Sequence, residues 1–203
     1  MQTLATRAFL LATELHANQR RKASLVPGVP YLSHLMEVAG MVMSSGAPDT
    51  VVAAALLHDA IEDQGNRTRA SIQARLGLEV LALVEECTEE GTGGAVKAPW
   101  LERKKAALQH MPSLSMFALM IRTADKLQNA RELCRNVYLR GDEAYSGFRV
   151  DKALVLWYQR EAIQALQQRL TVLRSESPHQ PLLLITQCWL QELQEILSFL
   201  QSH

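Results

Sequence analysis

Four side chains that can bind a metal ion or transfer a proton lie within the stretch AALLHDAIEDQG, residues 54–65. They are His58, Asp59, Glu62 and Asp63. Side chains three or four positions apart share one face of an α-helix, so His58 would lie beside Glu62 and Asp59 beside Asp63. Three carboxylates this close repel one another, and burial at the end of an apolar helix disfavours the charge on each of them. A divalent cation would remove both penalties.

A cation needs more ligands than one helical turn offers, and two other segments supply candidates. His34 lies in a second expected helix, and Asp125 follows the nearly continuous apolar run of residues 116–124. A carboxylate after such a run points toward the core and must be paired or coordinated there. The competing interpretation of Asp125 is a buried ion pair with Arg122 or Lys126, although we expect Lys126 to project elsewhere. Imidazole and carboxylate ligands completed by water suit manganese, iron or zinc better than magnesium.

The elements that would position these residues are helices, because apolar residues recur at three- and four-residue steps and alternating stretches are missing. The sequence therefore predicts an all-α fold. We expect a first helix that ends near Lys22, a second over residues 31–45, and a third over residues 50–63 with Asp49 as its N-cap. Later helices are expected over residues 71–76, 79–88, 100–110, 113–135, 143–173 with Asp142 as N-cap, and 182–200.

Composition limits the classes of partner. The 203 residues carry 21 basic and 21 acidic side chains, so no overall field favours nucleic acid or an anionic membrane, and any recognition of phosphate must be local. No stretch approaches the roughly 18 consecutive apolar residues that a membrane-spanning helix needs. The cysteines Cys87, Cys134 and Cys188 are odd in number and far apart. This argues against a disulfide framework or a cysteine zinc site and fits a reducing cytoplasm.

Four separated blocks resemble the hydrolase domain of RelA/SpoT proteins and their stand-alone relatives, the small alarmone hydrolases. In chain order they read HANQRRK, PYLSH, AALLHDAIED and ADKLQNARE. The order of His34, the His58-Asp59 pair and Asp125 is also similar to the metal signature of the HD phosphohydrolase superfamily, which is all-helical. Several blocks in the right order are far more specific than a lone His-Asp pair. The resemblance implies a metal-dependent phosphohydrolase core over residues 1–140, with the helices of residues 141–203 packed on it or at a subunit interface.

The function implied by the resemblance is removal of the 3′-pyrophosphate from ppGpp and pppGpp, which yields GDP or GTP and lowers the alarmone in the cytoplasm. The implied cofactor is Mn²⁺. In this site a carboxylate one turn from the ligands can orient a water molecule and accept its proton. The resemblance assigns the metal to His34, His58, Asp59 and Asp125, and the acid pair to Glu62 and Asp63.

The substrate implied is a small nucleotide rather than a nucleic acid. Arg21 and Lys22, in QRRK, would meet the nucleotide, and Asn129, in DKLQN, would hold the ribose or its 3′-phosphate. Lys104, in LERKK, is a further candidate for binding phosphate. The glycine-rich segment GTGGAVK lacks the Gly-Lys-Ser/Thr ending of a phosphate-binding loop, so we interpret it as a plain loop.

Two alternatives remain open. The same metal site would act on another phosphorylated nucleotide, such as NADPH, if Ala23 and a longer loop before PYLSH alter the rim of the pocket. Alternatively, the chain is a non-catalytic regulatory module whose final amphipathic helix docks a partner and whose metal is structural. An open coordination position would count against the module, because structural metal sites are closed. The apolar faces of the C-terminal helices also predict a homo-oligomer.

Overall fold

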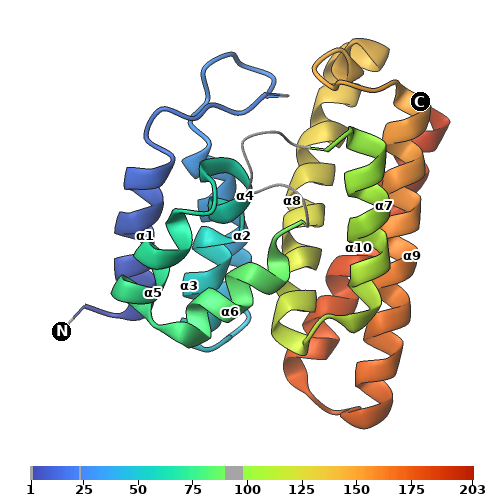
Figure 1. Ribbon diagram of the computed structural model, residues 1–203. Coiled ribbons are helices and arrows are strands. Elements are labelled where there is room, and N and C mark those ends of the chain that lie inside the picture. Colours follow the sequence, from blue (N-terminus) through green and yellow to red (C-terminus); the bar gives the residue numbers. More distant parts are fainter. Residues whose placement is uncertain (1, 23, 90–97) are drawn as a thin grey trace.

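The computed structural model describes residues 2–22, 24–89 and 98–203 (Figure 1). Within these ranges the regular elements are helices, which confirms the all-α prediction. None of these helices is both long enough and apolar enough to cross a lipid bilayer. Ala23 and residues 91–97, to which the sequence assigned a pocket rim and a plain loop, lie outside the described residues.

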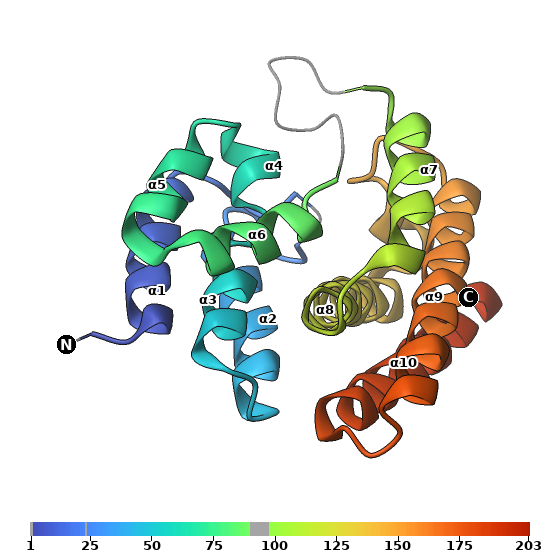
Figure 2. The ribbon, with the colours of Figure 1, turned by 60° about the horizontal axis from the view of Figure 1, so that its bottom comes forward.

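The helices form two groups on either side of one long helix, α8 (Figures 1 and 2). The first group contains α1 (Leu4–Leu15), α2 (Leu32–Ser44), α3 (Asp49–Leu57), α4 (Ala60–Gln64), α5 (Thr68–Leu76) and α6 (Leu78–Cys87). The second contains α7 (Trp100–His110), α9 (Lys152–Glu176) and α10 (Pro181–Ser202), with α8 (Met116–Arg140) between the groups and 3₁₀ turns at Met111–Ser113 and Gly141–Tyr145.

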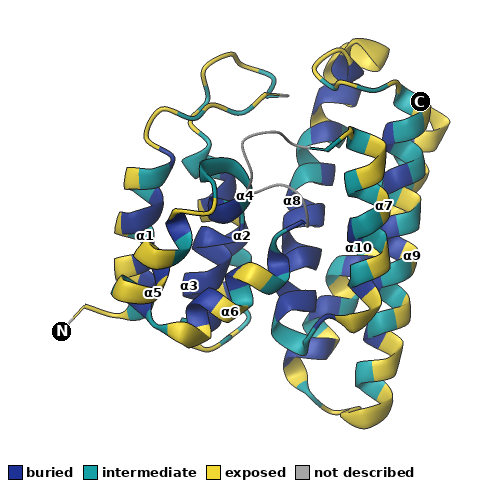
Figure 3. Cartoon of the chain, in the orientation of Figure 1, coloured by how far each residue is buried: buried dark blue, intermediate teal, exposed yellow. Residues whose placement is uncertain are grey.

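The central position of α8 explains the unusual composition of its first half. Elements pack on both sides of this helix, so its residues are buried nearly all the way round from Ala118 to Gln128 (Figure 3). A helix that is apolar on all faces is expected in such a position. Asp125 and Lys126 are therefore polar exceptions within a buried segment, and they need partners there.

One hydrophobic core joins the two groups of helices. The helices that follow residue 141 contribute to the same cluster of buried side chains as the helices that precede it. The division into a core over residues 1–140 and a C-terminal unit stays a prediction. Large core side chains include Leu35 and Leu57 from the first group, Leu119 and Leu127 from α8, Leu166 and Leu170 from α9, and Leu190 from α10.

The first helix ends at Leu15, so the prediction that it reaches Lys22 was wrong. The residues after it pair with the loop that returns to α2. The backbone N–H of Arg21 donates to the carbonyl of Val29 at 2.9 Å, and that of Tyr31 donates to the carbonyl of Gln19 at 3.0 Å. These bonds replace helical ones, and they hold Arg21 on an extended segment instead of a helix end.

The predicted helix over residues 50–63 is divided into α3 and α4 by a turn at His58 and Asp59. The Nδ1 atom of His58 lies 2.7 Å from the carbonyl oxygen of Ala55. This bond competes for the carbonyl that a continuous helix would offer to the N–H of Asp59. The interruption matters for the site, because consecutive side chains of a regular helix diverge by about 100°.

Two of the expected helix caps were also wrong. Asp49 is the first residue of α3, yet its carboxylate accepts hydrogen bonds from the N–H groups of Leu4 at 2.6 Å and Ala5 at 3.1 Å. It therefore caps α1, across 45 residues of sequence. The long C-terminal helix begins at Lys152, because Asp151 and not Asp142 accepts from a first-turn amide.

Asp49→Ala is expected to lower the free energy of unfolding by about 1 kcal/mol, because the N–H groups of Leu4 and Ala5 in the first turn of α1 lose their side-chain acceptor. Urea denaturation followed by circular dichroism measures this change. Asp142→Ala is the matched control: that carboxylate is 75% exposed and pairs with Lys152 at the surface, so we expect a loss below about 0.5 kcal/mol. Equal losses in the two variants would contradict the capping role.

Candidate metal centre

Two imidazoles and two carboxylates converge from α2, from the turn between α3 and α4, and from α8. The Nε2 atom of His34 lies 3.5 Å from Oδ2 of Asp59 and 3.4 Å from Oδ1 of Asp125. The Nε2 atom of His58 lies 3.2 Å and 3.8 Å from the same two oxygens. One ligand atom from each of His34, His58 and Asp59 lies within 4.8 Å of the others, a spacing that suits a single ion. The four residues that the sequence proposed as ligands are thus adjacent in the fold.

The turn at residues 58–59 accounts for half of this cluster. Because the helix is interrupted there, His58 and Asp59 approach each other to 3.2 Å although they are consecutive. Asp125 reaches the same point from the buried half of α8. Both histidines are 1% exposed, so the imidazoles are removed from solvent.

Both imidazoles turn the same nitrogen toward the centre. Their Nδ1 atoms face away, with Nδ1 of His58 against the carbonyl of Ala55 and Nδ1 of His34 against Oε1 of Gln128. Their Nε2 atoms are buried and form no hydrogen bond with the described residues. A buried nitrogen without a hydrogen bond is unfavourable, and a bound cation would satisfy both atoms at once. The donor set therefore fits a divalent metal ion of the manganese, iron or zinc type.

The electrostatics of the cluster keep both carboxylates charged. Burial alone would raise the pKa of Asp59, but His58 and His34 outweigh it and hold this pKa well below its usual value. Burial is likewise overcome at Asp125, first by Lys126 and then by the two histidines, so its pKa is also well below the usual value. The carboxylates in turn outweigh the burial of His58 and raise its pKa to about 10. The site is thus a strongly coupled charge cluster that attracts a cation.

Lys126 does not project elsewhere as the sequence suggested. Its Nζ atom lies 2.9 Å from Oδ2 of Asp125. The long side chain folds back over its neighbour because α8 is buried on all sides at this level and the ammonium group needs a counter-ion. Asp125 therefore uses Oδ2 for this ion pair, while Oδ1 faces the histidines and accepts a hydrogen bond from Asn129 at 2.6 Å. The ion-pair and metal-ligand interpretations of Asp125 are compatible.

The acid pair Glu62 and Asp63 lies on α4, directly after the turn. The N–H of Asp63 donates to the carbonyl of Asp59 at 2.9 Å, which places Asp63 one helical turn beyond a metal-ligand candidate. Its carboxylate accepts from Nε2 of Gln19 at 2.7 Å. Glu62 lies 3.4 Å from the guanidinium of Arg103. Both carboxylates are held by side chains from other elements, as groups with a fixed role in proton transfer would be.

A cavity of about 310 Å³ opens beside the metal centre. The four residues that the sequence proposed for nucleotide binding line it together with Asp63. Although the net charge of the chain is zero, the wall is rich in cations and aromatic rings. The cations are Arg20, Arg21, Lys22, Lys104 and Lys126, and the aromatic residues are Tyr31, Trp100, Phe148 and Tyr158. Such a wall suits an anionic nucleotide, whose base can stack while its phosphates meet fixed charges.

A family model described as HD domain matches residues 8–144, more than half of the chain. The chain belongs to the HD domain family. This confirms the resemblance drawn from the sequence blocks.

Among curated proteins, this HD domain is 40% identical over 126 residues to the guanosine-3′,5′-bis(diphosphate) 3′-pyrophosphohydrolase MESH1 of Xenopus tropicalis. The human protein of the same name is 39% identical over 126 residues. Each alignment covers 61% of this chain and 66% of the relative, slightly less than two thirds of its length. A probable guanosine-3′,5′-bis(diphosphate) 3′-pyrophosphohydrolase of Synechocystis is 41% identical over 86 residues, which are 42% of this chain and 11% of that protein.

Two solved structures share the fold of this HD domain. One, of a metazoan ortholog of SpoT described as hydrolysing ppGpp, has a TM-score of 0.71 at 22% identity and covers 95% of this chain and 96% of the other. A structure from Listeria monocytogenes EGD-e has a TM-score of 0.66 at 28% identity, with coverages of 81% and 99%. The first match extends across α9 and α10, so the shared architecture includes the C-terminal helices.

Two cations of the cavity wall in this HD domain are held in place by acids. Lys104 lies 2.6 Å from the buried carboxylate of Glu89, and Arg21 pairs with Glu132. The guanidinium of Arg21 also lies 5.4 Å from the ring centre of Tyr31, within cation–π range. Lys104 and Arg21 are therefore oriented before any ligand arrives, which lowers the entropic penalty of binding.

Several residues of this HD site were not found by sequence reasoning. The hydroxyl of Tyr31 donates to Asp59, and Gln128 supports His34. Both lie inside the blocks that carried the family resemblance, but their partners are 28 and 94 residues away. Glu89, which pairs with Lys104, follows the end of α6 and gave no signal in the sequence, because a single acid is usually solvated. Glu132, which pairs with Arg21, ends the block ADKLQNARE, but its partner lies 111 residues away.

Proposed function

We propose that this HD domain is a Mn²⁺-dependent hydrolase of the 3′-pyrophosphate of ppGpp and pppGpp in the cytoplasm. The observation that carries the proposal is the convergence of two imidazoles and two carboxylates beside a cavity lined by cations. The acid pair next to the centre and the names of the curated relatives support it. Under this proposal His34, His58, Asp59 and Asp125 hold the metal.

A divalent metal bound there supplies a Lewis acid for a phosphoryl oxygen and lowers the pKa of a bound water. The protein residues do the rest. Glu62 and Asp63 orient the attacking water and accept its proton. The water oxygen bonds to the phosphorus that is attached to the ribose 3′ oxygen. The bond between this phosphorus and the 3′ oxygen breaks, and the 3′ oxygen takes up a proton. The products are GDP or GTP and pyrophosphate.

The cavity residues bind and orient the substrate. Lys104 and Lys22 neutralise phosphate charge, and Arg21 offers a guanidinium that forms forked hydrogen bonds or stacks on a base. Asn129 is fixed by its hydrogen bond to Asp125 and accepts from Arg21 at 2.9 Å. It therefore links the nucleotide cavity to the metal centre, as expected of a residue that holds the ribose or its 3′-phosphate.

Purified protein incubated with ppGpp and Mn²⁺ is expected to release pyrophosphate, and chelation by EDTA is expected to reduce the rate by at least about 1,000-fold, because the Lewis acid is lost. Chromatography of the nucleotides identifies the product as GDP. Readdition of Mn²⁺ should restore the activity. Inactivity with Mn²⁺, Co²⁺, Zn²⁺ and Mg²⁺ would contradict the proposal.

A panel of nucleotides ranked by kcat/KM decides the substrate. Preference for NADPH or another phosphorylated nucleotide would replace ppGpp while leaving the metal centre intact. Binding of Mn²⁺ without hydrolysis of any member would indicate a regulatory module.

The homo-oligomer formed through the C-terminal helices stays a prediction, which light scattering at micromolar concentration tests.

A further inference from the structure

Gln128 connects a metal-ligand candidate to two distant side chains. It is 3% exposed in the middle of α8. Its Oε1 atom accepts hydrogen bonds from Nδ1 of His34 and from Nη2 of Arg21, the latter at 3.3 Å. Its Nε2 atom donates to Oε2 of Glu37 at 3.2 Å. The amide thus has a partner on each of its two ends.

These partners determine which way the amide faces. If it were reversed, its NH₂ group would point at the guanidinium of Arg21 and its oxygen at the carboxylate of Glu37. The contact with Arg21 would then join two hydrogen-bond donors, and the contact with Glu37 would join two acceptors. The reversed amide is therefore disfavoured. Glu37 and Arg21 together keep the oxygen of Gln128 toward His34.

The orientation of the amide selects the tautomer of His34. A carbonyl oxygen opposite Nδ1 requires the proton on that nitrogen, which leaves Nε2 of the neutral imidazole unprotonated. Nε2 is the atom that faces Asp59 and Asp125 and forms no hydrogen bond with the described residues. Fixing the second ring nitrogen in this way is a general means of tuning a metal-binding histidine.

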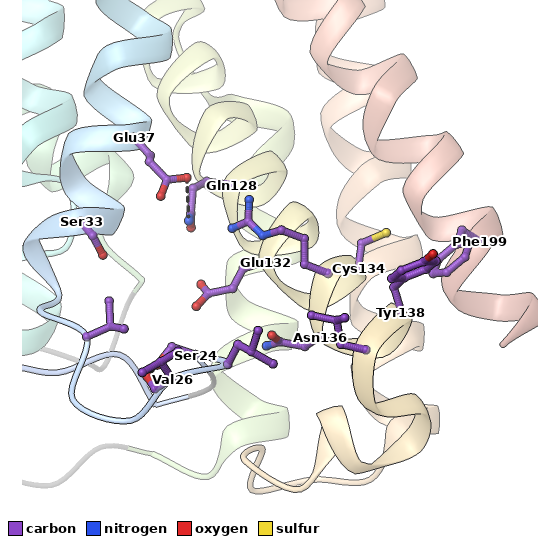
Figure 4. Close-up of a pocket in the computed structure, with 14 residues that line it drawn as sticks. Ser24, Val26, Ser33, Glu37, Gln128, Glu132, Cys134, Asn136, Tyr138 and Phe199 are labelled. Atoms are coloured by element: carbon purple, nitrogen blue, oxygen red, sulfur yellow. Dashed lines mark hydrogen bonds between the residues drawn. The ribbon is translucent and has the colours of Figure 1, made fainter.

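Glu37 occupies the solvent side of this arrangement. It lies on α2, three residues after His34, and its side chain reaches a second cavity of about 540 Å³ (Figure 4). In Figure 4 a dashed line marks the hydrogen bond between Glu37 and Gln128, which both line this cavity, and Glu132 lies further along α8. Because Glu37 is exposed, its carboxylate avoids the desolvation that a buried charge would suffer. The candidate metal centre is therefore supported from a cavity whose lining includes Glu37 and Gln128, neither of which lines the nucleotide cavity.

We propose that Glu37 is a positioning residue of the metal centre, which acts by holding the Gln128 amide in the orientation that keeps Nε2 of His34 available to a cation. This inference rests on the metal centre of the proposed function. It concerns cation affinity, so it is tested by binding and not by hydrolysis.

Calorimetric titration of the full chain with Mn²⁺ measures the effect. Gln128→Leu removes the acceptor of His34 and is expected to weaken Mn²⁺ binding by about 10- to 100-fold. Glu37→Met removes the acceptor of the amide and is expected to weaken it by about fivefold, the effect of one net hydrogen bond. Glu37→Gln retains an acceptor oxygen without the charge, and its affinity should stay within about twofold of the unaltered chain.

A double variant separates support through the amide from a direct effect of charge. If Glu37 acts through Gln128, then Glu37→Met combined with Gln128→Leu binds Mn²⁺ no more weakly than Gln128→Leu alone. Additive losses would overturn the inference, because a charge effect does not need the amide. Glu195→Met, at an exposed position on α10, is the control for loss of a carboxylate and should leave the affinity unchanged.

The remaining outcomes are also decisive. Unchanged affinity in Glu37→Met, or an equal loss in Glu37→Gln and Glu37→Met, would overturn the positioning role. Absence of Mn²⁺ binding by the unaltered chain would instead overturn the metal centre itself, and the inference with it. Thermal unfolding of each variant in the absence of metal verifies that the fold is retained, which we expect because Glu37 is exposed.

Discussion

Asp125→Asn is expected to abolish measurable Mn²⁺ binding and to reduce kcat/KM for ppGpp by about 1,000-fold, the loss of roughly 4 kcal/mol of transition-state stabilisation. The substitution preserves the shape of the side chain but removes the charge that lies 3.4 Å and 3.8 Å from the two imidazoles. A neutral amide is a weaker ligand for a divalent cation, and it also leaves Lys126 without its counter-ion. Metal affinity and activity should therefore fall together.

Calorimetry with Mn²⁺ and a pyrophosphate-release assay measure the two effects of Asp125→Asn in parallel. Asp142→Asn is the matched control, because it makes the same chemical change at a carboxylate that is 75% exposed. We expect the control to bind Mn²⁺ and hydrolyse ppGpp as the unaltered chain does. Retention of tight Mn²⁺ binding in Asp125→Asn would show that this residue is only an ion-pair partner of Lys126.

Glu62→Gln is expected to lower kcat by about 100- to 1,000-fold, the usual contribution of a positioned general base, while the affinity for Mn²⁺ changes by less than about threefold. Glu62 lies on α4, one turn beyond the ligand candidates, and not in the cluster of metal-binding atoms. The glutamine side chain preserves the contact distance to Arg103 but cannot accept a proton from water. The separation of kcat from metal affinity distinguishes this role from that of a ligand.

Steady-state kinetics with saturating Mn²⁺, together with calorimetry, resolve the two quantities for Glu62→Gln. Glu79→Gln, on the exposed surface of α6, serves as the control for the same chemical change at a carboxylate that has no hydrogen bond or ion pair with the candidate site among the described residues. A kcat within about threefold of the unaltered value would assign the proton transfer to Asp63 alone. A parallel loss of Mn²⁺ binding would make Glu62 part of the ligand set.

The type and order of the helices were predictable, whereas several of their ends were not. Apolar periodicity reports which residues face a core, and this is sufficient for α2, α7 and α10. The end of α1 and the interruption at His58 depend on hydrogen bonds that are not part of the helical pattern. The returning loop makes those after α1, and the imidazole of His58 makes the other. Asp49 was predicted as the cap of α3 but serves α1, because its carboxylate reaches a helix that is distant in sequence.

The candidate site likewise contains residues that the sequence could predict and residues that it could not. The ligand candidates could be named because a histidine beside carboxylates, or an acid within an apolar run, is unfavourable without a partner. Contacts between residues distant in sequence could not be predicted. Arg21 was proposed as a cation for the nucleotide, and in the fold it also pairs with Glu132, 111 residues away. Residues that support others, such as Gln128, are visible only once the helices are packed.

One face of the long helix α8 carries residues of the candidate site, and another contacts α10. Asp125, Gln128, Asn129 and Glu132 follow the three- and four-residue steps that bring side chains to one side of a helix. Elsewhere on the same helix, Arg131 forms two 2.6 Å contacts with Glu192 of α10. The C-terminal helix α10 thus holds α8, the helix that carries Asp125 and the cavity residues. A chain trimmed to the family blocks would expose the apolar side of α8 to water. A substitution that displaces α10 would shift α8 and with it Asp125, the one ligand candidate on that helix.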